Sequence, residues 1–249
     1  MNGFSFLVLD SFSKNIQTLF HQTFKDKINP RVLLDKIIKE FELNENLNQD
    51  FTKIQLIHDN ELQTLVPSAL FEEANLTDYI KYNAKIFKSD FITYDTISNQ
   101  DIMLVYVPFV NINNYIFDRF GSFEYKHSST VLIEKVLRLK NTNDRTLYVN
   151  VESSIIDIII VKSNSLIFYN RFEYKTKEDF IYFILFTIEQ LDLNPEKLRC
   201  EFFGSINSND ELYLIAYKYI RNISILPFDK MNYYKEKNTE NFILLNSFN

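Results

Sequence analysis

The side chains that most often carry catalysis are few and scattered in this sequence. Three histidines, His21, His58 and His127, are far apart and match no metal-binding spacing such as His-Glu-X-X-His. Asp59 follows His58, which allows an acid–base pair at a strand end, although we interpret the two residues as a solvated loop pair. The single cysteine, Cys200, lies in an apolar run, so we expect a core thiol rather than a nucleophile. The sequence therefore predicts no catalytic residues and no metal site.

Composition narrows the classes of function further. Only 3 of the 249 residues are glycine, and no P-loop, G-X-G-X-X-G or G-X-S-X-G motif occurs. The net charge of −6 argues against non-specific binding of nucleic acid, so we expect no nucleic-acid partner. No apolar run of about 18 residues is present, so we expect no membrane span. One cysteine allows no intrachain disulfide, which fits the cytoplasmic location that we predict.

The most distinctive stretch, Pro108–His127, combines asparagines, a tyrosine-containing helix and an aromatic, charged strand. Tyrosine, arginine and phenylalanine often anchor protein interfaces, so one interpretation is a recognition surface. The other is a capped helix and an edge strand that stabilise one lobe, because asparagine and Gly121 have ready capping roles. The candidate surface consists of Asn111, Asn113, Asn114, Tyr115, Asp118, Arg119, Tyr125 and His127.

The second half of the sequence shows the clearest order of elements. Three strand-like runs precede an apolar helix and a fourth strand, which ends at Gly204. A further helix carries Leu212, Ile215 and Tyr219, and a last strand spans Ile223–Leu226. The first four strands and the apolar helix are predicted at Thr146–Val151, Ile155–Lys162, Leu166–Tyr174, Leu198–Phe203 and Lys177–Leu193.

The first half shows a similar order with one leading strand fewer. Asn29 and Pro30 suit the cap and first position of a helix, which we predict at Pro30–Leu43. Polar residues at Asn141–Asp144 indicate a boundary between lobes 1–143 and 144–249. The other strands are predicted at Phe4–Leu9, Ile16–Phe24, Phe51–Ile57, Phe91–Ile97, Ile102–Val107, Ser122–Tyr125 and Phe242–Leu245, and the other helices after Ser68 and at Thr77–Asn83, Asn111–Phe120 and Thr130–Leu139.

Four stretches carry a resemblance to a known family. Val105–Tyr115, Asp118–His127, Thr64–Phe71 and Asp90–Tyr94 are similar to the domain of unknown function 3822 family of Bacteroidetes. The order of elements, given twice, resembles the actin-like ATPase fold of the ribonuclease-H-like superfamily. The resemblance implies a two-lobed α/β protein with a duplicated βββαβαβα order, and it carries no established activity.

The resemblance also implies a departure at the start of the chain. Members of the family begin one strand earlier and lead into an Asn-Gly hairpin, whereas here Met1 directly precedes Asn2 and Gly3. We therefore expect the first strand of the fold to be missing or shortened. Such a loss would leave an open sheet edge, which proteins usually cover.

In the actin-like superfamily, two strand turns hold phosphates, each with an aspartate followed by a glycine-rich turn. At the second turn of this chain, Asn150 stands where the metal-facing aspartate is expected, and Glu152 stands where a glycine is expected. An adenosine-contacting glycine pair is reduced to one glycine. The resemblance thus implies a degenerate nucleotide cleft formed by Asn150, Glu152, Ser153, Ser154, Asp157 and Gly204.

These observations favour a non-catalytic interaction or scaffold protein without a cofactor. The alternative is a weak ATP-binding protein or ATPase that uses ATP with magnesium in an unusual cleft. The partner is expected to be a protein of unknown identity, and a homodimer is an open alternative.

Overall fold

The computed structural model describes residues 2–13, 15–82, 85–87, 89–139, 144–226 and 241–248. The chain divides into two compact units, Met1–Leu132 with Ile243–Asn249, and Ile133–Phe242. We call them unit 1 and unit 2. Residues 140–143, next to the predicted lobe boundary, and residues 231–240 of the predicted polar tail lie outside the described residues.

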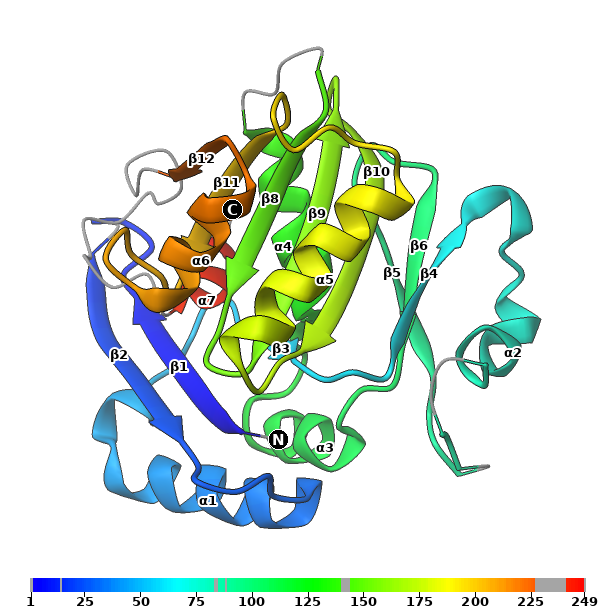
Figure 1. The fold of residues 1–249 in the computed structure, drawn as a ribbon. Coiled ribbons are helices and arrows are strands. Elements are labelled where there is room, and N and C mark those ends of the chain that lie inside the picture. Colours follow the sequence, from blue (N-terminus) through cyan, green and yellow to red (C-terminus); the bar gives the residue numbers. More distant parts are fainter. Residues whose placement is uncertain are drawn as a thin grey trace. The chain divides into compact units, whose positions relative to one another are not determined.

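The strands described in unit 2 form one five-stranded sheet with the order β10-β9-β8-β11-β12. The central strand β8 pairs antiparallel with β9 and parallel with β11, so it joins a hairpin to a parallel pair. Two helices, α5 and α6, contact each other, and Figure 1 shows α5 lying across one face of the sheet. The elements are β8 (Thr146–Val151), β9 (Ile155–Lys162), β10 (Ser165–Glu173), α5 (Lys177–Gln190), β11 (Arg199–Gly204), α6 (Glu211–Tyr219) and β12 (Asn222–Ile225).

The core of unit 2 lies between this sheet and the two helices. Phe180, Ile184 and Ile188 of α5 are buried with alternate residues of β8 and β9. The start of α5 is fixed by Thr176, whose side chain accepts a hydrogen bond from the backbone of Asp179 in a reciprocal capping box. Cys200 of β11 is wholly buried in the same core, and burial raises the pKa of its thiol, which agrees with the predicted core role.

The described residues of unit 1 form three separate sheets. A hairpin pairs β1 with β2, the strands β3 and β7 run parallel, and an antiparallel sheet has the order β4-β6-β5. The elements are β1 (Gly3–Leu9), β2 (Ile16–Thr23), α1 (Pro30–Leu43), β3 (Gln55–His58), β4 (Gln63–Pro67), α2 (Leu76–Ile80), β5 (Thr93–Thr96), β6 (Ile102–Tyr106), α3 (Val110–Phe120) and β7 (Glu124–His127).

The helices α1 and α3 share one apolar cluster in unit 1. Leu33 and Ile37 of α1 are buried with Ile112 and Ile116 of α3. The predicted start of α1 is confirmed, because the side chain of Asn29 accepts hydrogen bonds from the first backbone N–H groups of the helix. Helix α4 (Ser128–Arg138) contains the division between the units, and α7 (Phe242–Asn246) closes the described chain.

Two local predictions were wrong, and one strand was not predicted. The predicted strand at Phe242–Leu245 is the helix α7, because an apolar run this short does not distinguish the two periods. Ser68 begins a short 3-10 helix but makes no side-chain cap. The strand β4 at Gln63–Pro67 was not predicted, although it pairs along its whole length with β6.

Candidate functional site

The candidate site is the turn between β8 and β9 in unit 2. Asn150 of β8 and Asp157 of β9 are register partners, and both side chains are buried. The turn between them is tight, because the backbone N–H of Glu152 donates to the carbonyl of Ile155 at 2.9 Å. Tyr174 fixes the turn from outside, since its hydroxyl donates to the carbonyl of Glu152 at 2.6 Å. Burial first, and the Glu152 carboxylate second, raise the pKa of Tyr174.

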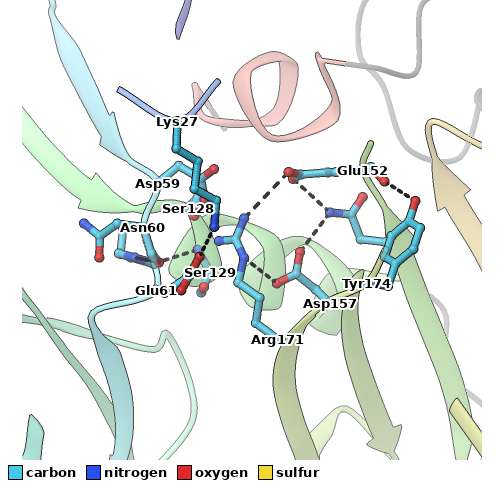
Figure 2. A network of polar contacts seen from close by, with 12 residues as sticks. Lys27, Asp59, Asn60, Glu61, Ser128, Ser129, Glu152, Asp157, Arg171 and Tyr174 are labelled. Atoms are coloured by element: carbon cyan, nitrogen blue, oxygen red, sulfur yellow. Dashed lines mark hydrogen bonds and ion pairs between the residues drawn. The ribbon is translucent and has the colours of Figure 1, made fainter. Parts of the chain in front are cut away.

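An arginine from the third strand closes this turn. The guanidinium of Arg171 lies 3.7 Å from the Asp157 carboxylate and 3.6 Å from the Glu152 carboxylate (Figure 2). The Arg171 side chain is only 6% exposed and that of Asp157 only 1%. Charges buried this deeply are tolerated when they are paired, so the three groups form one electrostatic unit.

Two neutral donors also form hydrogen bonds to the Asp157 carboxylate. The Asn150 amide donates to one carboxylate oxygen at 3.1 Å, and the Tyr169 hydroxyl donates to the other at 2.8 Å. The same Asn150 amide reaches Glu152 at 3.5 Å. The Asp157 carboxylate is thus engaged by groups of the chain itself.

Gly204 lies beside this turn and keeps an unusual backbone. Its φ is +86°, and a Cβ added there would lie 2.4 Å from the carbonyl oxygen of Val151 and 2.7 Å from Oδ1 of Asn150. Only glycine fits such a position without strain. The structure therefore brings together Asn150, Glu152, Asp157 and Gly204 at one turn, while Ser153 is an exposed and Ser154 a half-buried residue of that turn.

Sequence reasoning missed three members of this network, Arg171, Tyr169 and Tyr174. A signal was available, because Arg171 and Asp157 are register partners on neighbouring strands of the predicted meander. A charge of each sign at facing positions of two apolar strands predicts a buried pair. Among the described residues, no group of three or more His, Cys, Asp or Glu side chains could hold a metal ion.

The candidate recognition surface on α3 and β7 is only partly exposed. Asn114, Asp118 and Arg119 are exposed. The Arg119 guanidinium also donates to Asn48 and lies over the ring of Phe41.

Other members of that predicted surface serve packing within unit 1. The Asn111 amide donates to the carbonyl of Pro30 at 2.8 Å, Tyr115 contacts Phe41 edge to face, and Asn113 binds His58. The inclusion of His127 was wrong, because its side chain is 0% exposed.

A second buried polar cluster surrounds two histidines of unit 1. His58 and His127 are register partners on β3 and β7, although 69 residues separate them. Nε2 of His58 lies 2.9 Å from Oδ1 of Asn113, and its Nδ1 accepts from the backbone N–H of Phe109. Burial lowers the pKa of His58 to about 4, partly opposed by Asn113.

The predicted solvated pair of His58 and Asp59 was also wrong. His58 is buried, and Asp59 turns to another partner, since it accepts from the Ser128 hydroxyl at 2.6 Å (Figure 2). The side chain of Asp95 completes the cluster by accepting from the Thr130 hydroxyl and the His127 backbone. Burial raises the pKa of Asp95 in spite of these bonds.

Two solved structures are similar to this chain over most of its length. One, from Bacteroides thetaiotaomicron VPI-5482, is described as a protein with actin-like ATPase fold and unknown function; it has a TM-score of 0.80 at 21% identity, over 90% of this chain and 87% of that chain. The other is the PilM-PilN type IV pilus biogenesis complex, with a TM-score of 0.61 at 11% identity, over 98% and 94%. These likenesses confirm the predicted actin-like ATPase fold.

No curated protein matches the sequence. No helix in the described part of the chain is long and apolar enough to cross a membrane. A family model described as "Protein of unknown function (DUF3822)" matches residues 1–223, so the chain belongs to this family, as its motifs predicted.

Proposed function

We propose that this protein is a non-catalytic interaction protein that uses the actin-like ATPase fold without a working nucleotide site. The observation that carries the proposal is the guanidinium of Arg171, which lies between the carboxylates of Asp157 and Glu152. A metal-bound nucleotide needs carboxylate oxygens that are free to face the cation or its waters. Here an internal cation already pairs with both carboxylates.

The chemistry of the turn supports the same conclusion. Asn150 supplies a neutral amide instead of a carboxylate, and Glu152 places a negative charge in the turn, where it would repel phosphate. Tyr174 binds the carbonyl of Glu152 and so restrains the backbone. A turn of this kind lacks the positive charge that attracts an anion, and the backbone N–H of Glu152 is already bound to the carbonyl of Ile155.

An interaction role is supported by the surface of α3 and by one structural relative. Phe117 is 59% exposed, the exposed Asn114 lies three residues before it on the same side of α3, and the exposed Asp118 follows it directly in the sequence. An exposed aromatic beside polar groups is typical of interface anchors. The PilM-PilN structure is a protein complex on a similar fold, and we extend to this chain only the expectation of a protein partner.

The nucleotide arm of the proposal is tested by thermal unfolding with magnesium and ATP. A site occupied at one hundred times its dissociation constant raises the free energy of unfolding by about 2.7 kcal/mol. For a chain of this size, that corresponds to a rise in Tm of roughly 5–10 °C. We expect no rise in Tm at millimolar ATP, with calorimetric titration as the second measurement.

A weak ATP-binding protein remains the second candidate, because Gly204 keeps the positive φ and close approach that a ligand-facing turn uses. It predicts a rise in Tm that is lost in Asp157→Asn and kept in Asp118→Asn, an exposed control in unit 1. That result would overturn the non-catalytic proposal.

The interaction arm is tested by capture from a lysate of the native cells with tagged protein. We expect a reproducible protein partner that Phe117→Ala combined with Asp118→Ala releases, while the exposed control Phe12→Ala retains it. A homodimer is measured separately by light scattering at several concentrations. Loss of the partner in the control as well would contradict a binding role for α3.

A further inference from the structure

The two helices that cover the sheet of unit 2 expose apolar side chains on their outer sides. Seven consecutive residues of α5, Phe180–Phe186, are apolar, so this stretch of the helix has no polar side. Its outward members Tyr182 and Phe186 are 58% and 41% exposed. A run of six apolar residues in α6 contains Leu214 and Tyr217, which are 49% and 62% exposed. A helix that is apolar on every side is ordinarily covered on every side.

These exposed side chains belong to one surface, because both helices lie on the same face of the sheet. α5 leads from β10 to β11 and α6 leads from β11 to β12, and both connections run in one direction along the strand order. Right-handed crossovers between parallel strands then place the two helices side by side and parallel. The helices contact each other, and an ion pair of 3.1 Å between Lys177 and Glu211 joins their first turns. We call the surface formed by Tyr182, Phe186, Leu214 and Tyr217 the α5–α6 face.

The size of the α5–α6 face matches what a stable dimer buries. The four side chains are about half exposed, and at roughly 200 Å² for a large side chain they present on the order of 400 Å² of apolar surface. A standard interface buries about 800 Å² on each partner, of which roughly 56–58% is apolar. Exposed apolar patches of a few hundred Å² mark interaction sites.

The charges along α6 fit a second copy of the same helix. Glu211 begins α6, and Lys218 lies two turns later on the same side, with Leu214 between them. When two copies of α6 pack antiparallel about a two-fold axis, Glu211 of each copy faces Lys218 of the other, and Leu214 lies at the axis. Lys218 is exposed, and no ion pair within the described part of the chain involves it.

We propose that this protein forms a homodimer in which the α5–α6 faces of two copies pack against each other, with the two copies of α6 antiparallel. The apolar side chains form the centre of the interface. The two pairs of Glu211 with Lys218 lie at its rim, where ion pairs determine orientation more than affinity. The proposal goes beyond the interaction role of α3 in unit 1, and either of the two can fail alone.

The first test is the mass of the protein in solution, measured by sedimentation at several concentrations. We expect a species of twice the 29.7 kDa of one chain. Tyr217→Glu should weaken the dimer about 100-fold, because it places a charge in the centre of the interface. Tyr82→Glu, at a side chain of unit 1 that is 82% exposed, should leave the dimer unchanged. A chain that is still monomeric at about 100 μM, or a folded Tyr217 variant that dimerises as well as the parent, would overturn the proposal.

The second test exchanges the charges at the rim. Glu211→Lys and Lys218→Glu each place like charges opposite each other, so each variant alone should dimerise at least about tenfold more weakly. An equal mixture of the two variants should dimerise again, because every facing pair then has one positive and one negative member. Thermal unfolding of each variant checks that it is folded. Folded variants that do not recover on mixing would overturn the antiparallel arrangement.

A disulfide tests the position of the axis without changing any charge. Leu214→Cys should form an interchain disulfide under mild oxidation, because the two copies of this residue meet at the axis. Tyr82→Cys is the exposed control and should form none at the same concentration. The native Cys200 does not interfere, since it is wholly buried. A Leu214→Cys chain that forms no more interchain disulfide than the control would overturn the proposal.

Discussion

Units 1 and 2 bury polar side chains in chemically different ways. In unit 2 the buried groups are charged, with the Arg171 guanidinium against the carboxylates of Asp157 and Glu152. In unit 1 the buried groups at the parallel pair are the rings of His58 and His127, which bind amide, backbone and carbonyl partners. The first arrangement depends on a partner charge, and the second depends on the absence of a proton.

The comparison teaches how the same fold tolerates polar groups in two cores. Removing one partner of a buried ion pair destabilises the fold, because the remaining charge is left without compensation. A buried neutral histidine destabilises the fold when the solution becomes acidic enough to protonate it. Unit 2 is therefore expected to be sensitive to mutation at its turn, and unit 1 to be sensitive to pH.

The largest effect is expected from Asp157→Ala in unit 2. Removing the carboxylate leaves the buried Arg171 charge with only the partly exposed Glu152 carboxylate as its partner, and it should lower the free energy of unfolding, measured by urea denaturation, by up to about 3–5 kcal/mol. The double change Asp157→Leu with Arg171→Met removes both charges and should recover most of the loss. If the double variant is as unstable as the single one, packing rather than charge explains the effect.

A smaller effect separates the two positive-φ glycines, one in each unit. A Cβ at Gly204 would meet the Val151 carbonyl oxygen at 2.4 Å, whereas a Cβ at Gly121 would meet nothing within 4 Å. Gly121→Ala should cost about 1–2 kcal/mol of backbone strain alone. Gly204→Ala should cost about 3–4 kcal/mol, because a steric clash adds to the strain. Equal losses of stability in the two variants would show that the backbone around Val151 moves away from the added Cβ at no cost.

The pH dependence of unit 1 is expected to come partly from His58. Its folded pKa of about 4 lies below its ordinary value, so the unfolded chain binds the proton more readily between the two. Its contribution to stability is complete above pH ~6.5 and is lost as pH falls, by about 2 kcal/mol at pH ~5.

The control for this prediction is His58→Gln, which keeps a donor for Asn113 and does not titrate. Urea unfolding at several pH values should show a shallower acid slope in the variant. The difference between the two proteins isolates His58 from Asp95, whose raised pKa acts in the opposite direction. Parallel slopes would contradict the assignment.

The smallest effects are expected at exposed ion pairs, which occur in both units. Lys27 pairs with Glu61 in unit 1, and Lys177 pairs with Glu211 in unit 2, at 3.3 and 3.1 Å. Glu61→Gln and Glu211→Gln should each change the free energy of unfolding by less than about 1 kcal/mol, and less at high salt. A larger loss at either pair would mean that the geometry of that pair is unusually well fixed.

The regular elements of the fold were predictable because their signals are local. The order of strands and helices along the second half of the chain follows from periodicity, and the helix at Pro30–Leu43 follows from periodicity and capping. Both predictions are confirmed. The strand at Gln63–Pro67 was missed because its pairing with Ile102–Tyr106 comes from sequence-distant residues. Local propensity carries little information about such an edge.

The candidate site was predictable in part for the same reason. Asn150, Glu152 and Asp157 lie within eight residues, so one turn brings them together. Arg171 comes from the next strand, and its contact depends on register rather than on spacing. The pairing of His58 with His127 depends on a parallel register across 69 residues, which no local pattern shows.

Cys200 gives this chain an intrinsic reporter of opening. It is the single thiol of the sequence, and it lies wholly buried on β11. A thiol-specific reagent can reach it only in molecules whose five-stranded sheet has separated from its helices. The rate at which Cys200 is labelled under native conditions therefore reports this opening, and no probe has to be introduced.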